Sequence, residues 1–140
     1  MAFVDGASRG NPGPAGYGAY LRLEDEIIEI SGFLGRTTNN IAEYSGLLEA
    51  LTVAKELGAS DVDVVSDSLL MVNQMLGLYQ VKHPNLLPLF RRAKYLTQGF
   101  HRFEIRHTLR SGNKDADRLA NVAVDRGEGR VVARFPCSAE

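Results

Sequence analysis

The chain has 140 residues, of which 44% are hydrophobic and 24% charged, which is the size and composition of one globular domain. It contains no run of about 18 apolar residues, so we expect no membrane-spanning helix. The net charge of −1 argues against a protein that binds nucleic acid through its overall charge.

Apolar patterning predicts strands and helices that alternate after an initial hairpin. A continuous apolar run marks a buried strand at 62–66, and apolar residues at helical spacing mark a helix at 40–57 that Gly58 ends. A short acidic turn separates two further strands, which should pair as a hairpin. In chain order, the expected elements are strands 1–5, 17–23 and 27–33, helix 40–57, strand 62–66, helices 67–76 and 86–98, strand 100–107 and helix 113–125.

Residues 6–18, GASRGNPGPAGYG, are expected to form a loop because they hold five glycines and two prolines. Near the other end of the sequence, residues 130–135 either add a short strand or stay loose. Strands that alternate with helices predict an α/β fold with a mixed sheet covered by helices. Strands joined through a helix should be parallel, with right-handed crossovers, so the ends of the first and fourth strands should lie side by side.

Two local features bear on where the protein works. The residues MAFVDGAS lack the basic region and long apolar stretch of a secretory signal. The single cysteine, Cys137, has no partner for a disulfide within the chain. We therefore expect a cytoplasmic protein that does not associate with a membrane.

Basic residues are concentrated in residues 82–106, which carry six lysine or arginine side chains against Glu104 alone. One interpretation is a face that contacts phosphate groups beside an acidic site. The other is a solvated helix face, and charge by itself favours this second interpretation.

Four carboxylates lie at separate points of the chain, each where a strand is expected to end or a helix to begin: Asp5, Glu43, Asp67 and Asp117. The expected topology brings them towards one end of the sheet. Carboxylates gathered from distant segments repel one another, and a fold keeps such a group together when a divalent cation lies between them. As a group, they predict a metal site.

Each carboxylate also has a structural explanation that involves no metal. Taken singly, each explanation is as good as a functional one. These alternatives are an Asx turn at Asp5 before Gly6, a capping box of Asn40 with Glu43, a helix N-cap at Asp67 and an ion pair of Asp117 with Lys114.

The chain resembles ribonuclease H of the type 1 class in four segments spread over residues 5–125. They are DGASRGNPGPAG, TTNNIAEYSGLLEAL, VSDS and HTLRSGNKDADRLAN, and their order and spacing fit the family. The resemblance implies a five-stranded mixed sheet of order 3-2-1-4-5 with an antiparallel second strand. It also implies a ribonuclease H domain at 1–128, followed by a C-terminal tail at 129–140.

The same resemblance implies a monomeric endonuclease that binds RNA/DNA hybrids and cuts their RNA strand with two Mg²⁺ ions, which Mn²⁺ can replace. Products would carry 5′-phosphate and 3′-hydroxyl ends. The metal-binding acids would be Asp5, Glu43, Asp67 and Asp117, of which Asp5 would bridge both ions. His107 would assist proton transfer or product release.

Asp115 competes with Asp117 for the place of the fourth metal ligand. Asp117 is preferred because it directly precedes the sequence RLAN at 118–121, as the acid of the family does. The offset of two residues also turns Asp115 about 200° around the helix, to the opposite side.

Hybrid contacts implied by the resemblance lie in the glycine-rich segment and at the start of the helix at 40–57. Discrimination of RNA from DNA would use the 2′-hydroxyl and the shape of the duplex, and free N–H groups at the helix start would help to hold a DNA phosphate. Helix capping alone is the alternative for the two asparagines. The implied contacts are Gly6, Ser8, Asn11, Thr38, Asn39 and Asn40.

Two departures from the family pattern concern substrate binding. The segment GLYQVKHPNLLPLFRRAK is shorter than the basic, tryptophan-containing insertion of some members, and Leu69 stands where some relatives have a groove-contacting glutamine. Two other functions stay open: a non-catalytic nucleic-acid- or protein-binding module of the same fold, and a nuclease of this fold that cuts other duplexes.

Overall fold

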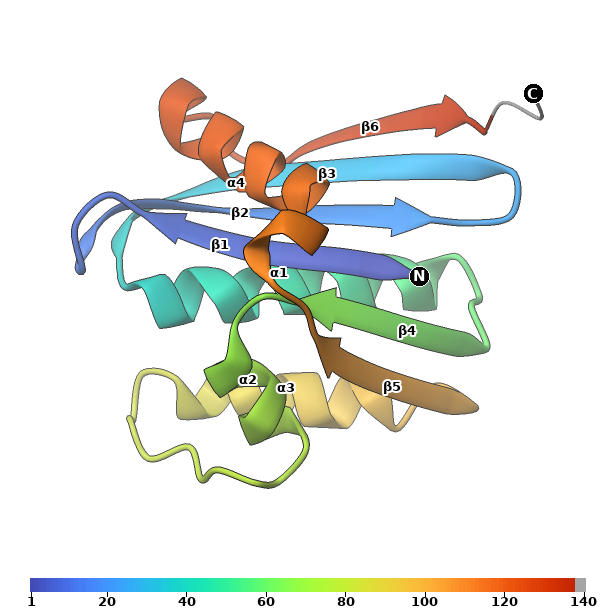
Figure 1. Ribbon diagram of the computed structural model, residues 1–140, viewed down its shortest axis with the longest axis horizontal. Coiled ribbons are helices and arrows are strands. Elements are labelled where there is room, and N and C mark those ends of the chain that lie inside the picture. The colour runs from blue at the N-terminus through green and yellow to red at the C-terminus, as the bar shows by residue number, and fades with distance from the viewer. Residues whose placement is uncertain (138–140) are drawn as a thin grey trace.

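The computed structural model describes residues 1–137, which form a mixed six-stranded sheet of order β5-β4-β1-β2-β3-β6 with helices on both faces (Figure 1). The expected order 3-2-1-4-5 is confirmed, with β6 added beside β3. None of the helices in this range is long and apolar enough to cross a membrane. The elements are β1 (Ala2–Ser8), β2 (Gly13–Arg22), β3 (Glu26–Thr37), α1 (Asn39–Glu56), β4 (Asp61–Ser66), α2 (Leu69–Met75), α3 (Leu87–Thr97), β5 (Arg102–His107), the 3-10 turn η1 (Arg110–Gly112), α4 (Lys114–Arg126) and β6 (Val131–Pro136).

Strand directions also agree with the prediction. β1 pairs antiparallel with β2 and parallel with β4, and β4 pairs parallel with β5. Of the two possibilities for the tail, the structure shows the strand: β6 pairs antiparallel with the first half of β3. The last three residues of the predicted tail, 138–140, lie outside the described range.

The predicted loop at residues 6–18 is wrong. β1 continues to Ser8 and β2 begins at Gly13, so only residues 9–12 form the turn. Glycine in these strands allows a helix to pack closely against the sheet. A Cβ on Gly18 would lie 2.4 Å from the carbonyl oxygen of Ala116 in α4. Glycine within a strand often marks such a close backbone approach.

Helix starts differ slightly from the prediction because hydroxyl side chains cap them. Thr38, not Asn40, caps α1, and its Oγ1 accepts a hydrogen bond from the Ile41 N–H at 3.3 Å. Ser68, not Asp67, caps α2, and its Oγ accepts from the Met71 N–H at 3.2 Å. The side chains of Glu43 and Asp67 are therefore not needed to cap these helices.

The core lies between the sheet and α1, which crosses β1 and β2 and carries α3 on its outer side (Figure 1). α4 covers β1, β2 and β3 on the opposite face. Burying a valine, leucine or isoleucine side chain stabilises the fold by roughly 1.5–3 kcal/mol, so the apolar cluster between α1 and the sheet fixes the position of α1. Its fully buried members include Val4, Ile28, Ile30, Leu47 and Leu51.

Candidate active site

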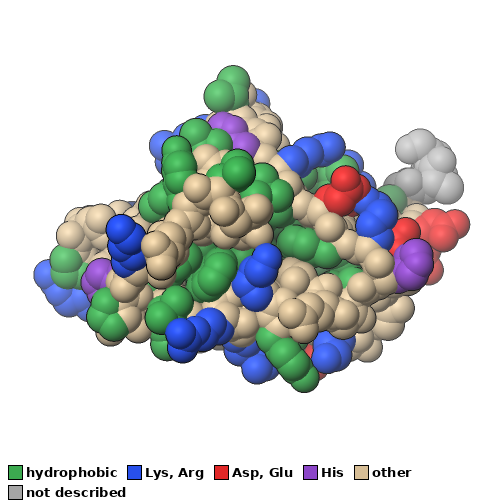
Figure 2. Space-filling view, turned by 90° about the horizontal axis from the view of Figure 1, so that it is seen from below, with side chains coloured by type: hydrophobic (Ala, Val, Ile, Leu, Met, Phe, Trp, Pro, Cys, Tyr) green, Lys and Arg blue, Asp and Glu red, His purple; other side chains and the backbone are tan. Residues whose placement is uncertain are grey.

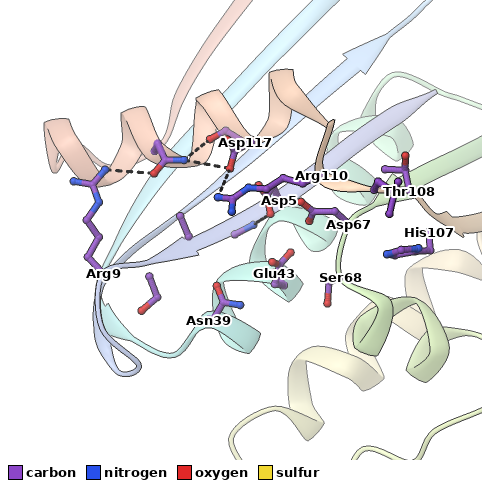
Figure 3. A pocket seen from close by; sticks show the side chains of 15 residues that line it. Asp5, Arg9, Asn39, Glu43, Asp67, Ser68, His107, Thr108, Arg110 and Asp117 are labelled. Atoms are coloured by element: carbon purple, nitrogen blue, oxygen red, sulfur yellow. Dashed lines mark hydrogen bonds and ion pairs between the residues drawn. The ribbon is translucent and has the colours of Figure 1, made fainter. Parts of the chain in front are cut away.

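The carboxyl ends of β1 and β4 bring two acids together. Val4 pairs with Ser66 in the parallel ladder, so Asp5 and Asp67 follow side by side at the ends of neighbouring strands. α1 crosses beneath this point and adds Glu43, as Figure 3 shows. One carboxylate oxygen from each of the three residues lies within 4.8 Å of the others. The predicted convergence of these three carboxylates is therefore present.

Asp117 comes from the first turn of α4 and lines the same cavity of about 660 Å³ as the three clustered acids (Figure 3). Its Oδ1 accepts hydrogen bonds from Arg110, at 3.3 Å, and from the Asn121 amide, at 3.3 Å. Asp115 instead pairs with Arg118 at 3.4 Å and does not line this cavity. The helix geometry thus separates the two candidates as expected.

Two of the three clustered acids are deeply buried, since Asp5 is 4% exposed and Glu43 is 5% exposed, whereas Asp67 is partly exposed. Burial, and then the charge of Asp67, raises the pKa of Asp5 to about 8, although a hydrogen bond from the Gly6 N–H at 2.9 Å opposes this shift. Burial, and then the charges of Asp5 and Asp67, raises the pKa of Glu43 to about 10. The fold thus holds together carboxylates that oppose one another's ionisation.

A hard divalent cation fits this group of side chains. The Oε2 atom of Glu43 is buried without a hydrogen-bond partner among residues 1–137. A cation bound within this group of three carboxylates would give the buried oxygen of Glu43 a partner. Sites whose ligands are all oxygen atoms suit Mg²⁺, Mn²⁺ and Ca²⁺.

The raised pKa values predict an unusual dependence of stability on pH in the metal-free protein. Above the ordinary carboxyl pKa near 4, the unfolded chain releases protons that folded Asp5 and Glu43 retain, so folding takes up protons. Each retained proton then costs about 1.4 kcal/mol of unfolding free energy per pH unit. This loss should continue until the pH passes about 8 for Asp5 and about 10 for Glu43.

Urea unfolding in chelator between pH 5 and pH 9 measures this slope, with Glu43→Gln as the comparison. The variant lacks one of the two retained protons, so its stability should fall less steeply with pH than that of the wild type. If the free energy of unfolding fell equally steeply with pH in both proteins, the prediction would be contradicted. Surface ion pairs do not affect this comparison, since both proteins share them.

The structure divides the six predicted hybrid contacts into two groups. Gly6, Ser8 and Asn39 line the cavity together with His107, which lies exposed at the end of β5. The other three, Asn11, Thr38 and Asn40, lie outside its lining. Asn11 instead contacts the start of α1, because its Oδ1 accepts a hydrogen bond from the Asn39 N–H at 3.0 Å.

Five polar residues of the cavity lining were not predicted: Arg9, Ser68, Thr108, Arg110 and Asn121. Two of them contact Asp117, and their sequence positions offered a signal. Asn121 follows Asp117 by four residues, a spacing that places both on one helix face. Arg110 lies in the loop between His107 and Asp117, where a side chain of its length reaches the helix start.

The predicted basic segment lies away from the carboxylates. Figure 2 views the molecule from below, where lysine and arginine side chains are scattered around apolar groups. The Lys94 ammonium donates to the Met75 carbonyl at the end of α2, and Arg102 pairs with Asp61 and Asp63. None of the basic residues at 82–106 lines the cavity, which agrees with the interpretation as a solvated face.

Comparison with known proteins places the whole site within one family. A family model described as "Reverse transcriptase-like" matches residues 3–123. A bifunctional protein of Mycobacterium tuberculosis is 48% identical over 125 residues, which cover 87% of this chain and 34% of that protein. Ribonuclease HI of Halobacterium salinarum is 43% identical over 126 residues, which cover 89% of this chain and 63% of that protein. The chain therefore spans about a third of the mycobacterial relative.

Comparison with solved structures identifies the same family. The crystal structure of RNase H1 from Halobacterium salinarum superimposes with a TM-score of 0.84 at 42% identity and covers 89% of this chain and 96% of that chain. The structure of LC11-RNase H1 in complex with an RNA/DNA hybrid gives a TM-score of 0.82 at 36% identity and covers 90% of this chain and 96% of that chain.

Proposed function

Because this chain belongs to the ribonuclease HI family, we propose that it is an endonuclease that hydrolyses the RNA strand of RNA/DNA hybrids. The observation that carries the proposal is the buried convergence of Asp5, Glu43 and Asp67, with Asp117 on the same cavity wall. Buried like charges weaken folding. A divalent cation bound between them would offset this cost.

The proposed cofactor is a pair of Mg²⁺ ions, with Mn²⁺ as a substitute. Asp5, Glu43, Asp67 and Asp117 would hold them, since carboxylate oxygens are the ligands these ions prefer. Bound there, divalent ions supply a nucleophilic water of lowered pKa and neutralise charge on the phosphate and the leaving oxygen. The products would be 5′-phosphate and 3′-hydroxyl ends.

The side chains around the carboxylates have separate tasks. The Gly6 N–H fixes Oδ1 of Asp5, which keeps that carboxylate oriented on β1 between the other strands. His107 is exposed at the cavity wall, where its imidazole can act as a general acid or base towards the reacting groups. Arg110 lines the same wall, 79% exposed, and its guanidinium can turn to a phosphate of the hybrid.

Hybrid binding is proposed at the β1–β2 turn and the start of α1. Ser8 and Asn39 offer polar groups on the cavity wall for the 2′-hydroxyl and base edges of the minor groove. Thr38 uses an oxygen lone pair to cap α1, which leaves its hydroxyl hydrogen for a DNA phosphate. Asn11 and Asn40 are exposed and are proposed as further contacts.

The extent of the active unit is proposed from the positions of the cavity residues in the chain. Every residue that lines the cavity lies between Asp5 and Asn121, so we propose that residues 1–128 contain the whole ribonuclease H domain. That the protein acts as a monomer in the cytoplasm stays a prediction.

Cleavage of labelled duplexes tests this function. Hybrid, duplex RNA and duplex DNA are incubated with the protein in Mg²⁺, in Mn²⁺ and in chelator. We expect cuts in the RNA strand of the hybrid alone, with 5′-phosphate ends, and none in chelator. Faster cutting of another duplex would favour the same-fold nuclease of different specificity, and no cutting of any duplex would favour the non-catalytic module.

A further inference from the structure

A chain of hydrogen bonds leads from the β1–β2 turn to Asp117. The Asn121 side-chain amide donates to the Asp117 carbonyl oxygen at 2.9 Å and to Asp117 Oδ1 at 3.3 Å. On its other side, Asn121 Oδ1 accepts a hydrogen bond from the Arg9 guanidinium at 3.4 Å. The two partners fix the orientation of the amide, because a carboxylate only accepts and a guanidinium only donates. Figure 3 shows Arg9 and Asp117 along the same side of α4, joined by these contacts.

Of the two side chains that donate to Asp117, Asn121 is the more buried. Arg110 also donates to Oδ1, but it is 79% exposed and lies in the loop before α4, where a phosphate group of the hybrid can attract it. Asn121 is half-buried and lies on the same helix as Asp117. Both donors bond Oδ1, and no hydrogen bond within residues 1–137 uses Oδ2, which is left for a ligand in the cavity.

Arg9 links this helix to the turn that follows β1. Its guanidinium pairs with Asp125 at 2.6 Å, and its backbone N–H donates to the Pro14 carbonyl at 2.9 Å. Ser8, the residue before it, lines the cavity at the place proposed for the minor groove. The turn and the fourth acid are thus connected through Arg9 and Asn121.

We propose that Asn121 is a positioning residue for Asp117, and that Arg9 acts through Asn121 to hold the hybrid-contacting turn and this carboxylate in a fixed relation. The inference rests on the proposed function, in which Asp117 binds metal. Partners that orient a metal ligand typically contribute 10- to 100-fold in metal affinity or activity. Arg9 should contribute less, since its contact with Asn121 is long and its side chain is 48% exposed.

Four variants test the proposal: N121A, N121Q, R9A and the double variant R9A/N121A. Alanine removes the amide donor, whereas glutamine keeps one that can reach an aspartate four residues earlier on a helix. D115N is the control, because it removes an exposed acid of the same helix that contacts Arg118 and leaves Arg9, Asn121 and Asp117 in place. Each protein is measured by Mn²⁺ calorimetry without hybrid, by kcat and KM for hybrid across Mg²⁺ concentrations, and by melting in chelator.

We expect N121A to bind Mn²⁺ about tenfold more weakly and to lose kcat by about 10- to 100-fold, with little change in KM. Its melting temperature should not fall, because alanine favours a helix more than asparagine does. N121Q should recover most of both losses, D115N should match the wild type, and R9A should show a smaller loss. The double variant should equal N121A, since both changes act through one contact.

The proposal is overturned if N121A binds Mn²⁺ and cuts hybrid like the wild type, or if N121Q is as impaired as N121A. Fully additive losses in the double variant would overturn the role of Arg9. A wild-type protein that does not cut hybrid would overturn the proposed function instead, and the Mn²⁺ titrations would still decide the role of Asn121 because they need no substrate.

Discussion

Replacing Asp5 by asparagine is expected to abolish hybrid cleavage while making the metal-free protein more stable. The asparagine oxygen can still accept the hydrogen bond from the Gly6 N–H, so the local backbone is retained. The negative charge that faces Glu43 and Asp67 is lost, however, and with it the affinity for divalent ions. Since bound metal contributes several kcal/mol to such a reaction, kcat should fall by about a thousandfold or more.

The stability gain of Asp5→Asn has the same electrostatic origin. Burial and neighbouring charge make ionised Asp5 unfavourable in the folded state, so a neutral side chain should stabilise the protein in chelator, by about 1–2 kcal/mol at pH 5 and by more at pH 8. Melting curves should show a rise of roughly 3–6 °C that is larger at pH 8 than at pH 5. Asp115→Asn, an exposed acid next to the site, is the control and should change neither property. A lower melting temperature for Asp5→Asn would mean that this carboxylate serves the fold.

Replacing Gly6 by alanine is expected to damage both the fold and the site, because α1 lies directly on this residue. The new Cβ would lie 2.3 Å from the Glu43 nitrogen and 2.4 Å from the Ala42 carbonyl carbon, and both atoms belong to backbone that cannot rotate away. α1 must therefore shift from β1, which carries Glu43 away from Asp5. Overpacking of this kind costs about 3 kcal/mol, and a misplacement of about 1 Å costs roughly a hundredfold in rate.

Thermal melting and a cleavage assay well below the melting temperature measure the two effects of Gly6→Ala separately. Gly129→Ala is the matched control, because a Cβ there meets no atom within 4 Å. The control should be near wild type in both assays. If Gly6→Ala kept wild-type activity, the relative placement of α1 and β1 would matter less for the site than the structure indicates.

The residue patterns were sufficient to predict a mixed sheet and the meeting of Asp5, Glu43 and Asp67 at one end of it. Apolar periodicity located α1 and β4, and the rule that parallel strands end at one edge of a sheet brought their acids together. The family resemblance added the strand order, the preference for Asp117 over Asp115, and His107. These features depend on patterns that a single sequence displays.

The errors concern features that depend on tertiary contacts. The glycines of β1 and β2 suggested a loop, whereas Gly18 is glycine because α4 crosses β2 at that point. β6 stayed undecided because its partner strand, β3, lies about a hundred residues earlier in the chain. The spacing of four residues placed Asn121 on the helix face of Asp117, but the atoms that Arg110 and Asn121 contact depend on side-chain rotamers, which the spacing does not determine.

The pairing of β6 with β3 also has a consequence for the solution behaviour of shortened forms. A version that ended at residue 128 would retain the entire cavity lining, yet it would uncover the hydrogen-bonding groups of residues 26–31 along the rim of the sheet. Uncovered strand rims recruit strands of other molecules. The C-terminal strand thus covers a rim of β3 that a shortened form would leave free to pair with another molecule, although it contributes nothing to the cavity where the acids meet.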